Sequence, residues 1–232
     1  MASVSFGKDS LAMLLKLIEF KYPLDEVVFY DTGMEFQAIY ETRNQILPLL
    51  EAEQIKYTEL HPEYEFQWKM FEKPVNGKNG FHYGYSWCGG RCRWGTTDKL
   101  KALEKYSKDC VEYVGLAVDE PERLQKERKG NKCFPLADWN MTEEDCLKYC
   151  YEQGFQWMEN GIPLYSILDR VSCWCCSNKN LKELENIYRF LPDYWERLKE
   201  LQSKTNRPMK GDGKSVFDLE KRFEKEGKSN GN

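Results

Sequence analysis

Residues 2–20 read Ala-Ser-Val-Ser-Phe-Gly-Lys-Asp-Ser-Leu-Ala-Met-Leu-Leu-Lys-Leu-Ile-Glu-Phe, a sequence that predicts a short strand, a polar turn and a helix. We expect the strand over Ala2–Phe6 and the helix over Ser10–Phe20, where leucine and isoleucine recur at helical spacing. The turn Gly7-Lys8-Asp9 joins the two elements. This unit begins an alternation of strands and helices that decides the fold class.

The alternation continues through the next forty residues. Glu26–Tyr30 is a nearly continuous apolar run, as expected for a strand that is buried on both faces of a parallel sheet. The sequence then predicts a helix over Phe36–Leu50 and a strand over Ile55–Leu60. Strands that alternate with helices predict an α/β fold with a doubly wound, mostly parallel sheet.

Beyond this sheet the pattern is less regular. The sequence predicts an aperiodic, cysteine-rich excursion over 61–95. It then predicts a helix over Thr96–Lys108, a strand over Cys110–Gly115 and a helix over 142–153 that is capped by Thr142 and Asp145. Two C-terminal helices are expected over Lys179–Leu191 and Asp193–Ser203. We expect residues 1–176 to form the α/β domain, with the excursion 61–95 inserted in it. Residues 177–232 would form a helical segment whose tail, rich in Gly, Lys and Asp, ends in a mobile stretch.

The composition excludes several classes of protein. Hydrophobic residues make up 41% of the 232 residues and charged residues 31%, which argues against a disordered chain. No apolar run approaches the ~18 residues of a membrane-spanning helix, and Lys8 and Asp9 interrupt the first apolar stretch, which argues against a signal peptide. A net charge of −4 argues against a protein that binds polyanions over its whole surface. Nine cysteines without a secretion signal favour a cytoplasmic protein and not a disulfide framework.

The first turn has the properties of a phosphate-binding loop. Amides at a helix N-terminus attract anions, and Gly7 would let a ligand approach the backbone closely. Lys8 adds positive charge, and the hydroxyl groups of Ser5 and Ser10 can donate to phosphate oxygens. Asp9 cannot donate while it is ionised, so we expect it to cap the helix or to help hold a magnesium ion. The alternative is an ordinary polar junction between a strand and a helix.

The spacing of the cysteines predicts a metal site. Cys88 and Cys92 lie in a glycine-rich loop, and Cys173 and Cys176 follow about eighty residues later. Four thiolates brought to one point suit zinc or an iron–sulfur cluster. Cys175 would be an alternative ligand or a free thiol, and buried, unligated cysteines are the alternative to the whole site. Four other cysteines are not expected to bind metal: Cys110, Cys133, Cys146 and Cys150.

Residues 68–108 are basic and aromatic. They contain nine Lys or Arg and three Asp or Glu, a local net charge of +6 (nine minus three), and seven aromatic residues are interspersed among them over 68–94. Cations and aromatic rings are what single-stranded nucleic acids bind. The alternative, which we favour, is that Arg91 and Arg93 neutralise the thiolate site while the rings form a small core. Neither His61 nor His82 is assigned to a metal or to catalysis.

Several segments resemble, in the same order, the phosphoadenosine phosphosulfate (PAPS) reductase-like family of the adenine-nucleotide α-hydrolase, or PP-loop, superfamily. The loop Ser5–Ser10 has the Ser-x-Gly-x-Asp-Ser form of the pyrophosphate loop, and Asp31-Thr32-Gly33 is similar to the family's Asp-Thr-Gly segment. Val114–Glu120 with Arg123 resembles its Gly…Glu…Arg stretch, and Pro135–Trp139 its Pro-Leu-x-x-Trp segment. The resemblance covers about residues 3–190.

The resemblance implies an adenine nucleotide that lies across the strand ends. ATP with Mg²⁺ would be cleaved at its α-phosphate, with sulfur transfer to a nucleic acid or small molecule as one outcome. Lys8, Asp9 and Asp31 would have catalytic roles, in charge compensation or in holding metal. The other nucleotide-binding residues would be Ser5, Gly7, Ser10, Thr32, Gly33, Gly115, Glu120 and Arg123. The cysteine layout resembles the iron–sulfur ligands of adenylylsulfate (APS) reductases, which favours a [4Fe–4S] cluster over zinc.

Two features depart from the family pattern. Ala117 stands where relatives carry an arginine, and no cysteine follows Cys176 in this chain, so the Glu-Cys-Gly motif of sulfonucleotide reductases has no counterpart. Two alternatives to the ATP reaction therefore stay open. One is a PAPS or APS reductase that uses an internal thiol such as Cys175, and the other is a non-catalytic nucleotide- or nucleic-acid-binding module with a structural metal.

Overall fold

The computed structural model describes residues 1–77, 80–88, 90, 92–127 and 130–229. Lys78 and Arg91, which contribute to the basic stretch, lie outside the described residues. The chain forms two compact units. The first contains Met1–Asp31, Glu35–His61 and Asp98–Trp157, and the second contains Thr32–Met34, Pro62–Thr97 and the chain from Met158 onwards.

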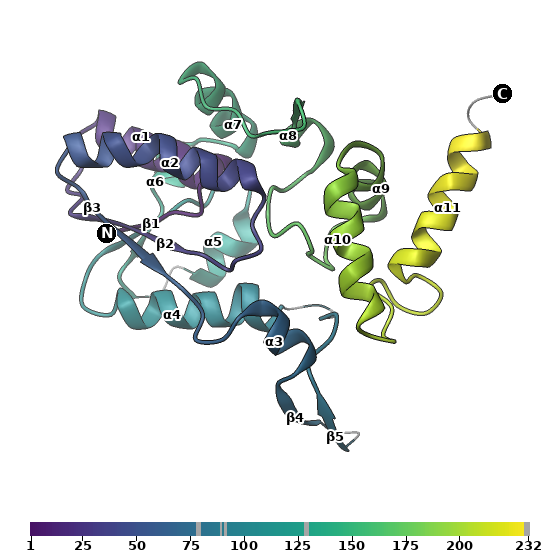
Figure 1. The fold of residues 1–232 in the computed structure, drawn as a ribbon. Coiled ribbons are helices and arrows are strands. Elements are labelled where there is room, and N and C mark those ends of the chain that lie inside the picture. Colours follow the sequence, from purple (N-terminus) through teal and green to yellow (C-terminus); the bar gives the residue numbers. More distant parts are fainter. Residues whose placement is uncertain (78–79, 89, 91, 128–129, 230–232) are drawn as a thin grey trace. The chain divides into compact units, whose positions relative to one another are not determined.

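A five-stranded parallel sheet forms the centre of the first unit (Figure 1). Its order is β3 (Lys56–Leu60), β2 (Glu26–Tyr30), β1 (Ala2–Ser3), β6 (Glu112–Val114) and β7 (Lys132–Cys133). The chain winds outward from β1 in one direction and then continues on its other side, so the strand order reverses between β1 and β6. The prediction of a doubly wound parallel α/β sheet is confirmed, and ligands bind such sheets at the point of reversal.

Helices cover both faces of this sheet. Figure 1 shows α1 (Lys8–Glu19) and α2 (Gln37–Ala52) on one face and α4 (Lys99–Tyr106) on the other. Three further helices complete the unit: α5 (Pro121–Glu127), α6 (Pro135–Asp138) and α7 (Glu143–Glu152). The predicted capping box of α7 is confirmed, since Thr142 Oγ1 accepts from the Asp145 amide at 3.1 Å and Asp145 accepts from the Thr142 amide at 3.0 Å.

The core explains why these strands are buried on both faces. Val27, Val28 and Phe29 of β2 are fully buried, as the apolar run predicts. On the α4 side, Val28 packs with Met1 and Leu103. The first strand is shorter than the predicted Ala2–Phe6, because the backbone of Phe6 turns into the left-handed region with φ of 58°.

The second unit is mainly helical. Its helices are α3 (Phe66–Phe71), α8 (Leu164–Ile167), α9 (Leu181–Phe190), α10 (Pro192–Ser203) and α11 (Val216–Ser229), and Arg93–Asp98 form a wide helical turn that continues into α4. Two hairpins complete it: β4 (Pro74–Gly77) with β5 (Gly80–Tyr83), and β8 (Met158–Glu159) with β9 (Ile162–Pro163).

No helix or strand was expected after Ser203, and α11 corrects this expectation. Val216, Leu219 and Phe223 recur at helical spacing and are buried. The Phe223 ring lies 5.8 Å from the ring of Trp195 in α10. Much of the tail is therefore an amphipathic helix that packs on α10.

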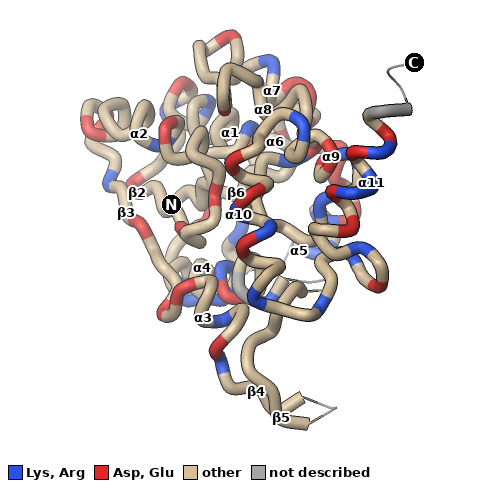
Figure 2. The backbone as a smooth tube through the Cα atoms, turned by 45° about the vertical axis from the view of Figure 1, so that its right-hand side comes forward, with Lys and Arg blue, Asp and Glu red and all other residues tan. Residues whose placement is uncertain are grey.

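The basic stretch 68–108 is divided between the two units. Its α4 lysines belong to the first unit, whereas the β4–β5 hairpin belongs to the second. The described strands of the hairpin carry no Lys, Arg, Asp or Glu (Figure 2), and they expose Phe81 (60%) and Tyr83 (66%). The described residues contain no helix of the length and apolarity that a bilayer-spanning segment requires.

Candidate nucleotide site and cysteine site

A cavity of about 180 Å³ lies beside the central strands of the first unit. It is lined at the carboxyl ends of these strands by Tyr30 of β2, Ser5 after β1 and Gly115 after β6. Ser10 of α1 and Arg123 of α5 also line it. Four residues that were predicted to bind nucleotide therefore meet around one cavity, where the strand order reverses.

The turn before α1 holds its shape through its own hydrogen bonds. The Ser5 amide donates to Ser10 Oγ at 3.1 Å, and Ser10 Oγ donates to the Gly7 carbonyl at 3.2 Å. Phe6 is fully buried, and its carbonyl accepts from Trp157 Nε1 at 2.7 Å. Gly7 is the N-cap, and no side chain of the described residues caps α1, so Asp9 does not cap this helix. An uncapped first turn suits an anion.

Gly115 brings the end of β6 against this turn. A Cβ atom at position 115 would lie 2.9 Å from Ser10 Cα and 3.0 Å from Ser10 N. These distances are shorter than van der Waals contact, and the neighbouring atoms belong to the backbone. Glycine is therefore required here by the close approach of two main chains.

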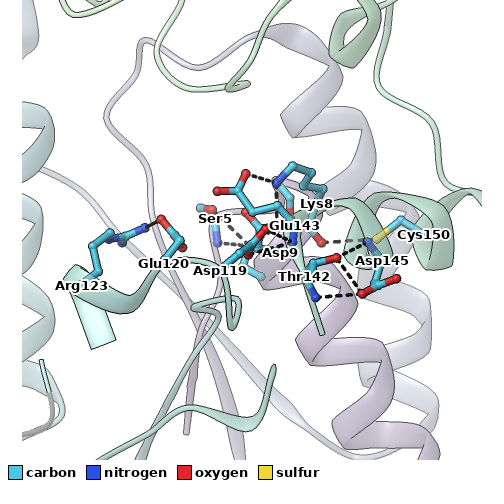
Figure 3. A network of polar contacts seen from close by, with 12 residues as sticks. Ser5, Lys8, Asp9, Asp119, Glu120, Arg123, Thr142, Glu143, Asp145 and Cys150 are labelled. Carbon is cyan, nitrogen blue, oxygen red and sulfur yellow. Dashed lines mark hydrogen bonds and ion pairs between the residues drawn. The ribbon is translucent and has the colours of Figure 1, made fainter. Parts of the chain in front are cut away.

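Lys8 is the centre of a polar network (Figure 3). Its Nζ lies 2.8 Å from Asp9 Oδ1 and 2.5 Å from Glu143 Oε2, and its side chain is nearly buried. Burial alone would lower the pKa of Lys8, but Asp9 and Glu143 outweigh it, so the pKa is raised and the ammonium group is charged. Glu143 was not predicted, because nothing in the sequence indicates that the N-terminus of α7 meets that of α1.

Asp9 has an unusual protonation equilibrium. Burial raises its pKa from 3.8 to about 6, Lys8 opposes this rise, and Glu143 and Glu120 add to it. Near pH 6 the Asp9 carboxyl group is therefore protonated in about half of the molecules. A cation that approached this group would favour its ionised form.

Glu120 and Arg123 are paired with each other. Arg123 Nη1 lies 2.5 Å from Glu120 Oε1. The preceding residue, Asp119, accepts from the Glu143 amide at 3.1 and 3.3 Å and so anchors the start of α7. The structure thus joins the predicted Glu120 and Arg123 to Asp119 and Glu143, which were not predicted, in one charged region beside the loop (Figure 3).

A second group of possible metal ligands lies at the ends of β2 and β3. Ligand atoms of Asp31, Glu59 and His61 lie within 4.8 Å of one another. Tyr40 Oη donates to Asp31 Oδ1 at 2.8 Å, and Arg43 Nη1 donates to Glu59 Oε2 at 3.0 Å. Two carboxylates and an imidazole can hold a divalent cation. Asp31 was predicted to hold metal, whereas Glu59 and His61 were not.

Thr32 and Gly33 belong to the second unit, unlike Asp31 before them. Thr32 Oγ1 lies 3.5 Å from Cys173 Sγ, within hydrogen-bonding distance for sulfur. Gly33 has a φ of 73°, in the left-handed region that favours glycine. These two predicted nucleotide-binding residues therefore lie in the same unit as the two cysteine pairs.

The two cysteine pairs come together in the second unit. Cys88 hydrogen-bonds to the Cys92 thiol, which with burial raises the pKa of Cys88. A Cβ atom at Gly95 would lie 3.4 Å from Cys92 Sγ and 3.7 Å from Cys173 Sγ, so sulfur atoms of both pairs flank this glycine. Cys175 is buried, and its pKa is raised by burial and by the neighbouring cysteines, including Cys173.

The remaining cysteines lie elsewhere. Cys146 and Cys150 of α7 are fully buried, and Cys150 Sγ lies 3.4 Å from the Lys8 carbonyl. Cys110 and Cys133 are exposed. All four belong to the first unit, whereas the two cysteine pairs belong to the second.

Comparison with known proteins identifies a family and a relative. The family described as "Phosphoadenosine phosphosulfate reductase domain" matches residues 1–179. An uncharacterized protein of Methanocaldococcus jannaschii, MJ0066, is 27% identical over 216 residues, which is 85% of this chain. The chain spans about two fifths of that relative's length. The family match, the parallel sheet and the loop at its reversal point agree, and the chain belongs to the PAPS reductase domain family of the adenine-nucleotide α-hydrolase superfamily.

Proposed function

We propose that the protein binds ATP in the cavity between β1 and β6 and cleaves it at the α-phosphate, with release of pyrophosphate. One observation carries the proposal: Ser5, Ser10, Gly115 and Arg123 line a single cavity at the reversal point of a parallel sheet. The uncapped first turn of α1 is the natural place for the phosphates. Reactions of this kind depend mainly on positioning and on charge compensation.

The charges around the loop indicate how these residues would act. Lys8 is held between Asp9 and Glu143, and nearby Glu120 is paired with Arg123, so two cations face three carboxylates. A polyphosphate would be repelled by this excess of negative charge. Bound Mg²⁺ supplies the missing positive charge, and it is usually held by one or two carboxylates together with the phosphates. Asp9 and Asp31 have the chemistry to hold it, and Arg123 would contact the nucleotide.

The four cysteines would hold a [4Fe–4S] cluster, with Cys88, Cys92, Cys173 and Cys176 as ligands. Zinc bound by four thiolates at ~2.3 Å would place the sulfur atoms about 3.8 Å apart. Among the described residues, no three thiol sulfur atoms lie mutually within 4.8 Å, and zinc stays the alternative to the cluster. Trp174 Nε1, between two of these cysteines, is a buried donor that lacks a hydrogen-bond partner in the described part of the chain. Such a donor suits a sulfur-rich ligand.

The bound cluster would hold the loops of the second unit together or take part in sulfur transfer. In sulfur transfer, a sulfide-level sulfur nucleophile would attack the adenylylated form of an acceptor, either a small molecule or a nucleic acid, and AMP would leave. Iron and sulfide analysis after anaerobic purification tests the cluster. Near-stoichiometric zinc without iron would contradict it.

The ATP reaction is tested by measuring pyrophosphate release and ATP affinity in the intact protein. Replacing Arg123 with alanine should weaken ATP binding about tenfold or more, since a charged hydrogen bond contributes about 1.5–3 kcal/mol. Lys126→Ala is the matched control, because Lys126 lies on the same helix and its side chain is 77% exposed. Absence of pyrophosphate release with every acceptor class, or equal effects of the two variants, would contradict the proposal.

The two alternative functions would give different results in these assays. Sulfite release from PAPS or APS with a dithiol would indicate a reductase, although burial raises the pKa of Cys175 and so weakens it as a nucleophile. Nucleotide or nucleic-acid binding without turnover would indicate a binding module.

A further inference from the structure

The β4–β5 hairpin exposes two aromatic rings to solvent. Phe81 is 60% exposed and Tyr83 is 66% exposed, more than any other large hydrophobic side chain that the structure describes. The aromatic residues of the basic stretch 68–108 were expected to form a small core, and Trp87, which is 2% exposed, agrees with this. Phe81 and Tyr83 do not. Neighbouring apolar rings that stay in solvent are typical of a surface that contacts a partner.

Both rings lie on one face of the hairpin. Successive residues of a strand point to opposite faces, so Phe81 and Tyr83 share a face. Asn76 and Pro74 lie directly opposite them on β4. The ring centroids of Phe81 and Tyr83 are 5.1 Å apart, and the ring planes meet at 83°. The described residues of the two strands include no Lys, Arg, Asp or Glu, so this face offers flat apolar surfaces without charge.

The base of the hairpin is fixed to the end of α3. The Gly84 amide donates to the Lys73 carbonyl at 2.7 Å, and the Tyr85 amide donates to the Lys69 carbonyl at 3.0 Å. A Cβ atom at position 84 would collide with the Met70 carbonyl, so the two main chains lie in direct contact. The rings are therefore presented on an ordered support, and binding to them costs less conformational entropy than binding to a mobile loop.

The segment that contains the hairpin is basic, although the whole chain carries a net charge of −4. Residues 73–97 contain four Lys or Arg and no Asp or Glu. Two of these cations meet on one ring at the hairpin base: Lys73 Nζ lies 5.3 Å and Arg93 Cζ 4.9 Å from the centroid of Tyr85. A partner that contacts this segment is therefore expected to combine apolar, planar groups with negative charge.

We propose that this face of the hairpin binds single-stranded nucleic acid, with unpaired bases stacked on Phe81 and Tyr83 and phosphates near Lys73 and Arg93. Proteins hold single strands through aromatic rings that stack on the bases and cations that follow the backbone. The bases of a duplex are stacked on one another, so their faces are closed to these rings. The inference deepens the proposed function by naming the class of acceptor. Binding stands by itself, whereas the acceptor role rests on the proposed ATP reaction.

The experiment measures binding to the intact protein in the absence of ATP. Fluorescence anisotropy follows labelled oligo-dT and oligo-rU of about 12 nucleotides, a length within the site sizes of such proteins, and a duplex of the same length. Phe81→Ala and Tyr83→Ala should each weaken single-strand binding at least about fivefold, because each removes a stacked base contact. Phe81→Trp and Tyr83→Phe keep a ring and should retain the wild-type affinity.

A control and a salt titration separate stacking from general effects. Phe190→Ala is the matched control, because Phe190 is an exposed ring (41%) of the same unit that ends α9 outside the basic segment. This variant should bind as the wild type does. Lys73→Met should reduce the slope of log affinity against log salt concentration by about 0.7, the value for one phosphate contact on a single strand.

The outcomes distinguish this inference from the proposed reaction. Absence of single-strand binding by the wild type, equally tight binding of the duplex, or equal losses in Phe81→Ala and Phe190→Ala would overturn the inference. Wild-type affinity in both Phe81→Ala and Tyr83→Ala would do the same. Pyrophosphate release without nucleic-acid binding overturns the inference alone. Binding that depends on the two rings, without pyrophosphate release, overturns the ATP reaction and leaves the inference standing.

Discussion

Replacing Gly115 with alanine should weaken both the fold and nucleotide binding. The added methyl group would lie 2.9 Å from Ser10 Cα, 3.0 Å from Ser10 N and 3.2 Å from Asp9 C, all backbone atoms of the first turn of α1. Forcing a methyl group into such a space costs about 1–3 kcal/mol. Because a chain of this size loses about 2–4 °C in Tm for each kcal/mol, the drop in Tm should be measurable by calorimetry. The turn must move to relieve the contact, so ATP affinity should fall at least about tenfold.

The matched control is Gly154→Ala. Gly154 has a φ of 85°, and a Cβ atom there would meet nothing within 4 Å, so alanine would add backbone strain without a steric contact. This variant should lose about 1 kcal/mol of stability and bind ATP as the wild type does. If Gly115→Ala retained wild-type affinity, or if both variants lost affinity in proportion to stability, the close approach of β6 to the loop would not matter for binding.

Three further changes test other parts of the structure. Asp9→Asn should stabilise the protein at pH 7 more than at pH 4, because the raised pKa of Asp9, about 6 instead of 3.8, makes wild-type stability fall as the pH rises through this range. The full pKa difference corresponds to about 3 kcal/mol. We expect about 1–2 kcal/mol, because the Asp9 side chain is 26% exposed and the variant loses its ion pair with Lys8. Urea unfolding at both pH values measures this, and an equal difference at the two would contradict it. Gly95→Ala places a methyl group at ordinary van der Waals distance, 3.4 and 3.7 Å, from two cysteine sulfur atoms, so the variant should keep its bound iron and change unfolding by less than ~1 kcal/mol; loss of iron without loss of stability would contradict this reading of the site. Thr142→Ala removes the capping box of α7 and should cost about 1 kcal/mol in thermal unfolding, whereas an unchanged Tm would mean that the cap is not used.

Four of the five strands of the central sheet could be predicted from the sequence because their signals are local, whereas β7 (Lys132–Cys133) was not predicted. The apolar run Glu26–Tyr30 and the capping box at Thr142 each lie within a few neighbouring residues, and both predictions are confirmed. The end of β1 could not be predicted, because the left-handed backbone of Phe6 depends on packing around it. The helix α11 was missed because Gly, Lys and Asp in the tail concealed the spacing of Val216, Leu219 and Phe223.

The same difference between local motifs and contacts from distant segments applies to the residues of the candidate sites. The loop residues and the cysteine pairs follow from short motifs, and the structure gathers each set. Partners from distant segments had no signal in one sequence: Glu143 meets Lys8 across 135 positions, and Thr32 meets Cys173 across 141. These contacts depend on how helices and loops pack, which residue spacing along the chain does not encode.

The buried left-handed Phe6 has a consequence for how the protein is made. A bulky residue in this conformation costs about 1–3 kcal/mol, and the hydrogen bond from Trp157 to its carbonyl helps to hold it. Trp157 leaves the ribosome about 150 residues later. A nascent chain that ends before it would carry the loop's whole sequence without this clamp. The ability to bind the ligand should therefore appear late in synthesis, when Trp157 at the end of the first unit can donate its hydrogen bond to Phe6.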